Sequence, residues 1–345
     1  MRINYWDNWK GIAIIAVVAI HASGSTERFQ EGSFNWDFGL IIRQLINFAV
    51  PMFLAISGYF SAKSSDKDPI SYYKNRLFKI ASPYLFWTAI YIVLKTPSLP
   101  PSISEMLRGV FFGTGIGIGY FVIVLSQFIF LTPLFSKIRR KTTHILIIIS
   151  ASIIGLIFTY YFSIINKEHI FSNFPEYALP FFVWYPFYHA GYFLARYKDD
   201  IKINKSHTNK LIYCFALFIS LSLIEGFFWA YNENYSFGVS QLKATSLTAS
   251  FFLFLVALSL ADEKKFLNRP LTISWFGKNS YAIYLIHILT LSVCQKILGL
   301  SEKLYSLQPV FVTLSTIASI AFCAIIIKTI RKALPTRLSK NILGN

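Results

Sequence analysis

Charged residues are scarce in this chain of 345 residues. Asp, Glu, Lys and Arg make up 14% of the sequence, whereas hydrophobic residues make up 54% and aromatic residues 18%. Because about a quarter of the residues in a typical soluble domain are charged, this deficit excludes an ordinary soluble protein. No polar stretch is long enough to form a domain of its own. We therefore expect a single domain over residues 1–345 with no attached soluble domain.

Cysteine is also rare. The three cysteines, Cys214, Cys294 and Cys323, lie in apolar runs at unrelated spacings, which is the pattern neither of a disulfide framework nor of a metal motif. No pair of histidines has the spacing of a metal-binding motif either. We expect packing roles for the cysteines, no metal site and no permanently bound cofactor.

Long apolar runs recur along the whole sequence, and each could cross a hydrocarbon core of roughly 30 Å as a helix. They predict an all-α integral membrane protein, a bundle of about ten transmembrane helices. The first run is expected to stay in the protein as a helix, because so many spans follow it. The predicted spans are 8–26, 38–61, 75–95, 119–136, 143–165, 177–197, 209–231, 242–261, 274–298 and 309–330.

The net charge of +17 is interpreted as a sign of how the chain is oriented in the membrane, and it does not indicate a nucleic-acid partner. A nucleic-acid module gathers its basic residues on one folded face, whereas here they lie in short segments between apolar runs. With a cytoplasmic N-terminus, 25 of the 33 Lys and Arg residues lie inside and 8 outside. Since cytoplasmic segments carry the excess of Lys and Arg, both termini are predicted to be cytoplasmic.

The first run, "NWKGIAIIAVVAIHASG" at 8–24, contains two groups that hydrocarbon disfavours, Lys10 and His21. Eleven residues of helix make three turns plus about 20°, so the two side chains share one face, roughly 16 Å apart along the axis. Lys10 is expected at the cytoplasmic mouth and His21 in the outer half of the membrane. The alternatives are an interfacial lysine that reaches back to water and an interior histidine bonded to a neighbouring helix.

The third run opens with "YYKNRLFKIASPYLFW", which places Arg76 and Lys79 on one helix face at the cytoplasmic end. The positive-inside bias alone would explain them. Together with Lys10, however, they suit an anionic head group at the mouth and a narrow arm that reaches towards His21. Coenzyme A has this shape, with phosphates at one end and a thioester at the other.

Burial disfavours a charged imidazole, so His21 is expected to be mostly neutral at neutral pH. It could then act as a general base on an attacking hydroxyl or as a nucleophile that carries the acyl group. Glu225 lies at a similar depth and is a candidate for orienting the imidazole or binding the acceptor, or else an interfacial glutamate. His189 and His287 are interpreted as packing or hydrogen-bonding histidines.

Five segments, in order, resemble the integral-membrane acyltransferase 3 family. They cover a basic residue separated from a histidine by ten intervening residues, the family's "PxFFxxSGY" pattern, its R-x-x-R motif, a fourth-helix stretch and "GxxSxxIYLxH". In this chain they read "YWDNWKGIAIIAVVAIH" (5–21), "VPMFLAISGYF" (50–60), "NRLFKIASPYLFW" (75–87), "YFVIVLSQFIFLTPLF" (120–135) and "SWFGKNSYAIYLIH" (274–287). In length and in having no attached domain, the chain is most similar to O-acetyltransferases of enterobacterial common antigen and other surface polysaccharides.

The resemblance implies that His21 is the catalytic histidine and that Lys10, Arg76 and Lys79 contact acyl-CoA. Lys10 and Lys79 stand where the family usually has arginine. Lysine keeps the charge but lacks the planar fork that grips phosphate with two hydrogen bonds, so the geometry at the phosphates is expected to differ.

Three hypotheses follow. The leading one is an enzyme of the bacterial inner membrane that moves an acetyl group from cytoplasmic acetyl-CoA to a hydroxyl of a lipid-linked or cell-surface glycan. The second is a glycan or lipid transporter in which His21 and Glu225 form a proton relay. The third is a structural membrane subunit, which leaves the shared face of Lys10 and His21 unexplained. No residue identifies the acceptor sugar or the acyl-chain length.

Overall fold

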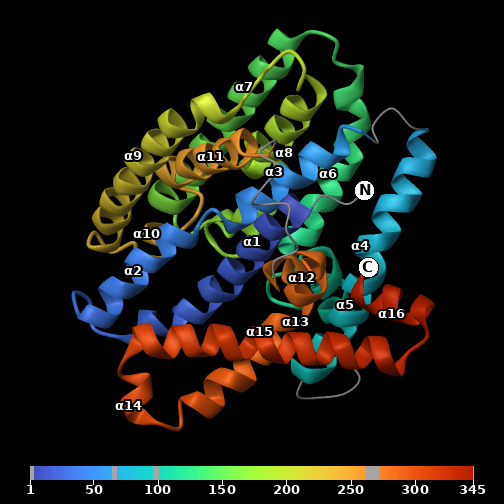
Figure 1. Cartoon of the computed structure of the whole chain (residues 1–345). Coiled ribbons are helices and arrows are strands. Elements are labelled where there is room, and N and C mark those ends of the chain that lie inside the picture. Colours follow the sequence, from blue (N-terminus) through green and yellow to red (C-terminus); the bar gives the residue numbers. More distant parts are fainter. Residues whose placement is uncertain (1–3, 64–67, 96–100, 262–271, 345) are drawn as a thin grey trace. The chain divides into compact units, whose positions relative to one another are not determined.

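The computed structural model describes residues 4–63, 68–95, 101–261 and 272–344, and this part of the chain is helical throughout, without strands (Figure 1). The predicted cytoplasmic cations Arg2, Lys67, Lys264, Lys265 and Arg269 lie outside the described residues. The α-helices are α1 (Asn4–Ala22), α2 (Phe34–Ile46), α3 (Ala49–Ser61), α4 (Pro69–Lys95), α5 (Ile103–Phe111), α6 (Tyr120–Lys137), α7 (Lys141–Tyr160), α8 (Phe181–Arg196), α9 (Lys205–Ala230), α10 (Tyr235–Gly238), α11 (Ala244–Ser259), α12 (Thr272–Lys278), α13 (Ser280–Leu298), α14 (Glu302–Tyr305), α15 (Gln308–Ala333) and α16 (Thr336–Leu343). Short 3-10 or π turns are η1 (Ser23–Arg28), η2 (Tyr161–Ile165), η3 (Ile170–Ser172) and η4 (Glu176–Ala178).

The all-α membrane bundle is confirmed, with eight stretches among the described residues that are long and apolar enough to span a membrane. The two remaining predicted spans, 177–197 and 242–261, become α8 and α11, each of 16 residues. A helix of that length covers only about 24 Å, less than a hydrocarbon core. The α8 helix begins four residues later than predicted, after η4 and Pro180, whereas α11 is two residues shorter than predicted at each end.

The predicted span 38–61 is two helices, α2 and α3, with a turn at 47–48 between them. Pro51 causes the break. A proline ring clashes with the carbonyl group four residues earlier, which here belongs to Asn47, and proline has no N–H to donate to it. The chain therefore leaves the helix at Asn47 and restarts at Ala49.

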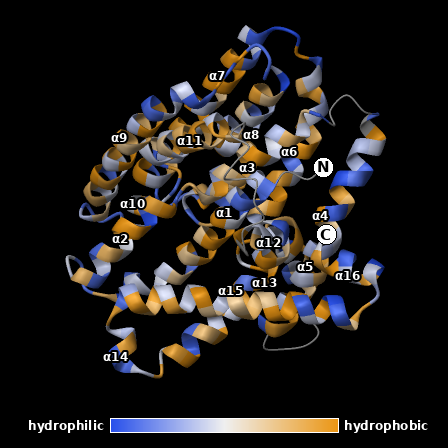
Figure 2. Ribbon diagram, in the orientation of Figure 1, coloured by the Kyte–Doolittle hydropathy of each residue, from blue (hydrophilic) through white to orange (hydrophobic). Residues whose placement is uncertain are grey.

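Two helices present most of their surface outward. Figure 2 shows predominantly apolar residues along α7 and α9, and only 11% of the most apolar window of each is buried. An apolar surface of this extent would aggregate in water. It is compatible with lipid, which agrees with a multi-pass membrane protein.

The helices form two compact units. The first comprises Met1–Phe53 and Lys202–Thr329, and the second Leu54–Ile201 and Ile330–Asn345. In the first unit the backbones of α1 and α12 are in contact at Gly11. A methyl group at this position would collide with the Ile273 carbonyl, so only glycine allows this approach. Small residues allow such close packing between membrane helices. The α1 helix is thereby held along the half that carries Lys10.

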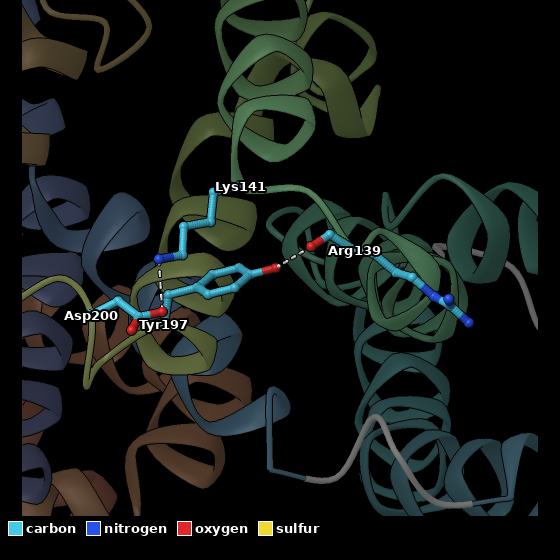
Figure 3. A network of polar contacts seen from close by, with 4 residues as sticks. All are labelled: Arg139, Lys141, Tyr197 and Asp200. Atoms are coloured by element: carbon cyan, nitrogen blue, oxygen red, sulfur yellow. Dashed lines mark hydrogen bonds and ion pairs between the residues drawn. The ribbon is translucent and has the colours of Figure 1, made fainter.

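In the second unit, polar contacts join the start of α7 to the end of α8 (Figure 3). The ammonium group of Lys141 pairs with the Asp200 carboxylate at 2.7 Å and lies 5.4 Å from the centre of the Tyr197 ring. The Tyr197 hydroxyl donates to the Arg139 carbonyl at 3.2 Å. Since both charged side chains are about half exposed, the ion pair contributes at most about 1 kcal/mol to the free energy of unfolding.

Candidate functional site

His21 lies in the last turn of α1 and is half-buried. Its ring faces that of His287 on α13, with 5.3 Å between the ring centres and 46° between the ring planes. The C-terminal ends of α1 and α13 also lie close together, since Gln295 near the end of α13 donates to the Ala22 carbonyl at 3.1 Å. The end of α1 and the middle of α13 thus bring the two histidines together in the first unit.

A cavity of about 690 Å³ opens beside His21. It lies where the C-terminal ends of α1 and α13 meet the start of α15, and Figure 1 shows α14 at the turn that joins α13 to α15. The lining residues are His21, Gly24, Ser25, Arg28, Ser292, Gln295, Lys296, Gly299, Leu300, Tyr305 and Phe311. Its volume is within the range of small-molecule sites, about 300 to 1,000 Å³. A reacting molecule can therefore occupy the space next to the imidazole.

His287 does more than pack. It is completely buried, and its Nδ1 donates to the Tyr284 carbonyl at 2.7 Å, the shorter of two backbone contacts. A carbonyl can only accept, so Nδ1 carries the proton and the Nε2 of the neutral ring is an acceptor. Among the described residues this buried Nε2 has no hydrogen-bond partner. This Nε2 atom can accept a hydrogen bond from an N–H group near the neighbouring His21 ring.

Arg43 of α2 is a further charged group near His21 and was not among the site residues predicted from the sequence. Its guanidinium donates to the Ile20 carbonyl at 3.3 Å and lies within electrostatic range of His21. The last carbonyls of a helix lack intrahelical partners, so this bond caps the end of α1 that carries the imidazole. The available signal was an arginine inside a predicted span, since ionisable residues in such segments are usually functional.

Lys10 and His21 lie on the same uninterrupted helix, which confirms the geometry assumed for their spacing. Lys10 is half-buried in the second turn of α1, so it is near the end of the helix opposite to the cavity. Its contact with acyl-CoA stays a prediction.

Arg76 and Lys79 belong to α4 in the second unit. Arg76 is half-buried, donates to the Phe60 carbonyl at 3.4 Å and lies 5.6 Å from the centre of the Tyr72 ring. Lys79 is exposed one turn further along. Arg76 is therefore held in place by these contacts. The slot that these residues were predicted to share with Lys10 stays a prediction.

Glu225 is placed against the start of α11. Its carboxylate accepts from the backbone N–H of Thr245 at 3.4 Å and from the hydroxyl of the same residue. A carboxylate at a helix N-terminus satisfies donors that lack intrahelical partners. Glu225 is not among the residues that line the cavity beside His21. Its predicted role in orienting His21 or binding the acceptor stays a prediction, while its structural role as a cap is visible.

A buried lysine, Lys243, lies next to this cap. Its side chain is fully buried, and its ammonium group donates to the Gln44 side-chain oxygen at 2.9 Å and to the Gly238 and Ser240 carbonyls at 2.8 Å each. Three acceptors match the three protons of an ammonium group. The Gln44 oxygen also accepts from Ser222 at 2.9 Å. The network therefore ties α2, α9 and the start of α11 together in the first unit.

We expect Gln44→Leu to lower the free energy of unfolding by about 3 kcal/mol, because it leaves a buried ammonium group one acceptor short. The measurement is a denaturant titration in mixed micelles. Gln30→Leu, which changes an exposed glutamine of the same unit, is the control and should cost little. An equal, small effect of both substitutions would mean that the Lys243 network does not stabilise the unit.

Comparisons with known proteins give two matches, and both are described as acyltransferases. Residues 3–328 match the family model described as "Acyltransferase domain". A Bacillus subtilis (strain 168) protein named "Putative membrane-bound acyltransferase YfiQ" is 27% identical over 164 residues, which is 45% of this chain and 45% of that protein. The match thus spans less than half the length of this relative. No solved structure matches the chain.

Proposed function

The chain belongs to the acyltransferase 3 family, and from this membership we propose that it moves an acetyl group from acetyl-CoA to a hydroxyl of a lipid-linked or cell-surface glycan in the bacterial inner membrane. The coarser statement, a multi-pass membrane acyltransferase, follows from the family and from the helices. The donor, the acceptor and the membrane are the finer parts of the proposal.

One observation supports the proposal most strongly. His21 lines a cavity at one end of α1, whereas Lys10 lies near the other end of the same helix, on the same face. About 16 Å of helix separates the two residues. A donor whose phosphates bind at the Lys10 end can thus present its thioester to an imidazole that an acceptor reaches from the cavity. This arrangement lets donor and acceptor meet at one imidazole, as an acyl transfer between two substrates requires.

In the direct mechanism, a neutral His21 takes the proton of the acceptor hydroxyl while the hydroxyl oxygen attacks the thioester carbonyl. A C–O bond forms, and the electron pair of the carbonyl moves to its oxygen. When the carbonyl is restored, the C–S bond breaks and the thiolate of CoA takes the proton from the imidazolium. The products are an acetyl ester and free CoA, and the imidazole returns to its neutral form.

In the covalent mechanism, His21 itself attacks the thioester and CoA leaves before the acceptor reacts. CoA takes up the proton of the other ring nitrogen as it leaves. The acceptor hydroxyl oxygen then attacks the acetyl group, the C–N bond to the imidazole breaks, and the hydroxyl proton returns to the ring. Incubation with radiolabelled acetyl-CoA without acceptor separates the two routes. Label on the protein that a later addition of glycan removes indicates the covalent route, and its absence indicates the direct one.

The test of the proposed function is a transfer assay with the purified full chain in proteoliposomes, using radiolabelled acetyl-CoA and lipid-linked saccharides. We expect one free CoA to be released for each acetyl ester formed. If saccharide crosses the membrane in response to a proton gradient and no CoA is released, the transporter hypothesis is correct and the proposed function is wrong.

We also expect His287 to act as a positioning residue. His287→Leu removes the Nε2 acceptor and should lower kcat about tenfold, with the KM for acetyl-CoA little changed. His287→Gln keeps an acceptor oxygen close to that position and should retain most of the activity. Steady-state kinetics of both variants provide the measurement. Equal losses in the two variants would indicate that His287 only fills space.

A further inference from the structure

The cavity beside His21 is basic, and several polar side chains lie among its apolar lining. Its lining includes two cations, Arg28 and Lys296, together with the hydroxyl groups of Ser25 and Ser292 and the amide of Gln295. None of its described lining residues is acidic. Both cationic side chains are exposed to solvent, so they are available to a ligand. The chemistry of the lining therefore favours a hydroxyl-rich ligand that carries negative charge.

The presence of two cations here is unusual for this chain. Under the predicted topology, only 8 of its 33 Lys and Arg residues lie on the outer side. Two of these eight line the same cavity, although one belongs to η1 and the other to the end of α13. Both are at the end of α1 opposite to Lys10, so they are separate from the residue predicted to hold the phosphates of CoA.

Aromatic rings complete the cavity. Tyr305 and Phe311 are lining residues, and Tyr305 is fixed between Phe311, at 5.2 Å between ring centres, and a stacked Phe29 at 5.6 Å. A fixed ring with one polar edge provides a large amphipathic contact surface at little entropic cost. The apolar face of a sugar ring can pack on such a surface while its hydroxyls bond to the serines and the glutamine.

We propose that this cavity binds the acceptor and that the acceptor is an anionic glycan, whose carboxylate or phosphate is held by Arg28 and Lys296. The inference rests on the proposed function, because it places an acceptor hydroxyl at His21. Two sources of negative charge share this chemistry, an acidic sugar and the phosphate of a lipid-linked saccharide. Charge-assisted hydrogen bonds to either anionic group would fix the position of the glycan relative to the imidazole.

The experiment measures binding to the full chain in nanodiscs, without acetyl-CoA. Three probes are compared: an oligosaccharide containing a hexuronic acid, its carboxyl-reduced neutral form, and the neutral form with a phosphate at the reducing end. We expect at least one charged probe to bind about tenfold more tightly than the neutral one. The preferred probe identifies the source of the charge. High salt should shrink the preference, because both cations are exposed.

The double variant R28Q/K296Q should bind all three probes equally weakly. K303Q is the matched control, because Lys303 is an exposed cation on α14 that is not among the lining residues. Equal binding of charged and neutral probes by the unaltered protein, or an unchanged preference in the double variant, would overturn the inference. Retention on immobilised CoA checks that the double variant is folded.

The failure of this inference is distinguishable from the failure of the proposed function. Acetyl transfer to the neutral glycan at the same rate as to the charged ones would leave the transferase intact and overturn the anionic acceptor. Selective binding of a charged probe without any acetyl transfer would support the site and overturn the transferase.

Discussion

Replacement of His21 by alanine is expected to reduce acetyl transfer by about a hundred- to ten-thousand-fold, the range associated with loss of a general base. The loss should be in kcat, because the imidazole is proposed to act on the reacting atoms, whereas the predicted donor contacts lie elsewhere. The measurement is ester formation from radiolabelled acetyl-CoA in proteoliposomes. Retention on immobilised CoA should be unchanged, since Lys10, Arg76 and Lys79 are intact.

His207→Ala is the control for His21→Ala. His207 is an exposed histidine in the first turn of α9, away from the cavity beside His21. Its replacement should leave the transfer rate within about twofold, because surface substitutions away from a site have small effects. Equal glycan acetylation by the His21 variant and the unaltered protein would contradict the assignment of His21 under either mechanism.

Replacement of Arg76 by alanine is expected to weaken donor binding about 10- to 100-fold. A guanidinium group can hold phosphate oxygens with two parallel charge-assisted hydrogen bonds, and alanine removes both. Arg76 is already fixed by its bond to the Phe60 carbonyl, so little entropy is lost when it binds. The loss should appear in the KM for acetyl-CoA and in retention on immobilised CoA.

Two further variants of α4 sharpen this prediction. Lys74→Ala removes an exposed cation two residues earlier, which lies on another face of the helix and should have little effect. Arg76→Lys keeps the charge but loses the planar fork, so donor binding should fall between that of the alanine variant and the unaltered protein. If Lys74→Ala weakens retention on immobilised CoA as much as Arg76→Ala, retention depends only on the total positive charge of the helix. Arg76 is then not a phosphate ligand.

Much of the fold could be predicted because lipid imposes a simple rule. A helix satisfies its own backbone in hydrocarbon, so a long apolar run predicts a helix of nearly the same length. This rule held for α1 and for α9. It was inaccurate where local chemistry competes with hydropathy. At 38–61 a proline divides the apolar run into α2 and α3, and at 242–261 the polar turn around Ser240 and Lys243 begins a shorter α11.

The site was predictable only where its members share a helix. Lys10 and His21 lie eleven residues apart on α1, so helical geometry alone relates them. His287 and Arg43 approach His21 from α13 and α2, and contacts of this kind depend on tertiary packing that a single sequence does not encode in its spacing. The cavity was unpredictable for the same reason, since its cations Arg28 and Lys296 come from distant segments.

In the proposed function, donor and acceptor reach His21 from opposite ends of α1. Sided proteoliposomes test it most directly, with radiolabelled acetyl-CoA supplied only on the side of the N-terminus and the glycan enclosed on the other side. We expect labelled glycan in the opposite compartment and free CoA on the side of the N-terminus. Labelling only when both substrates are on the same side would contradict it.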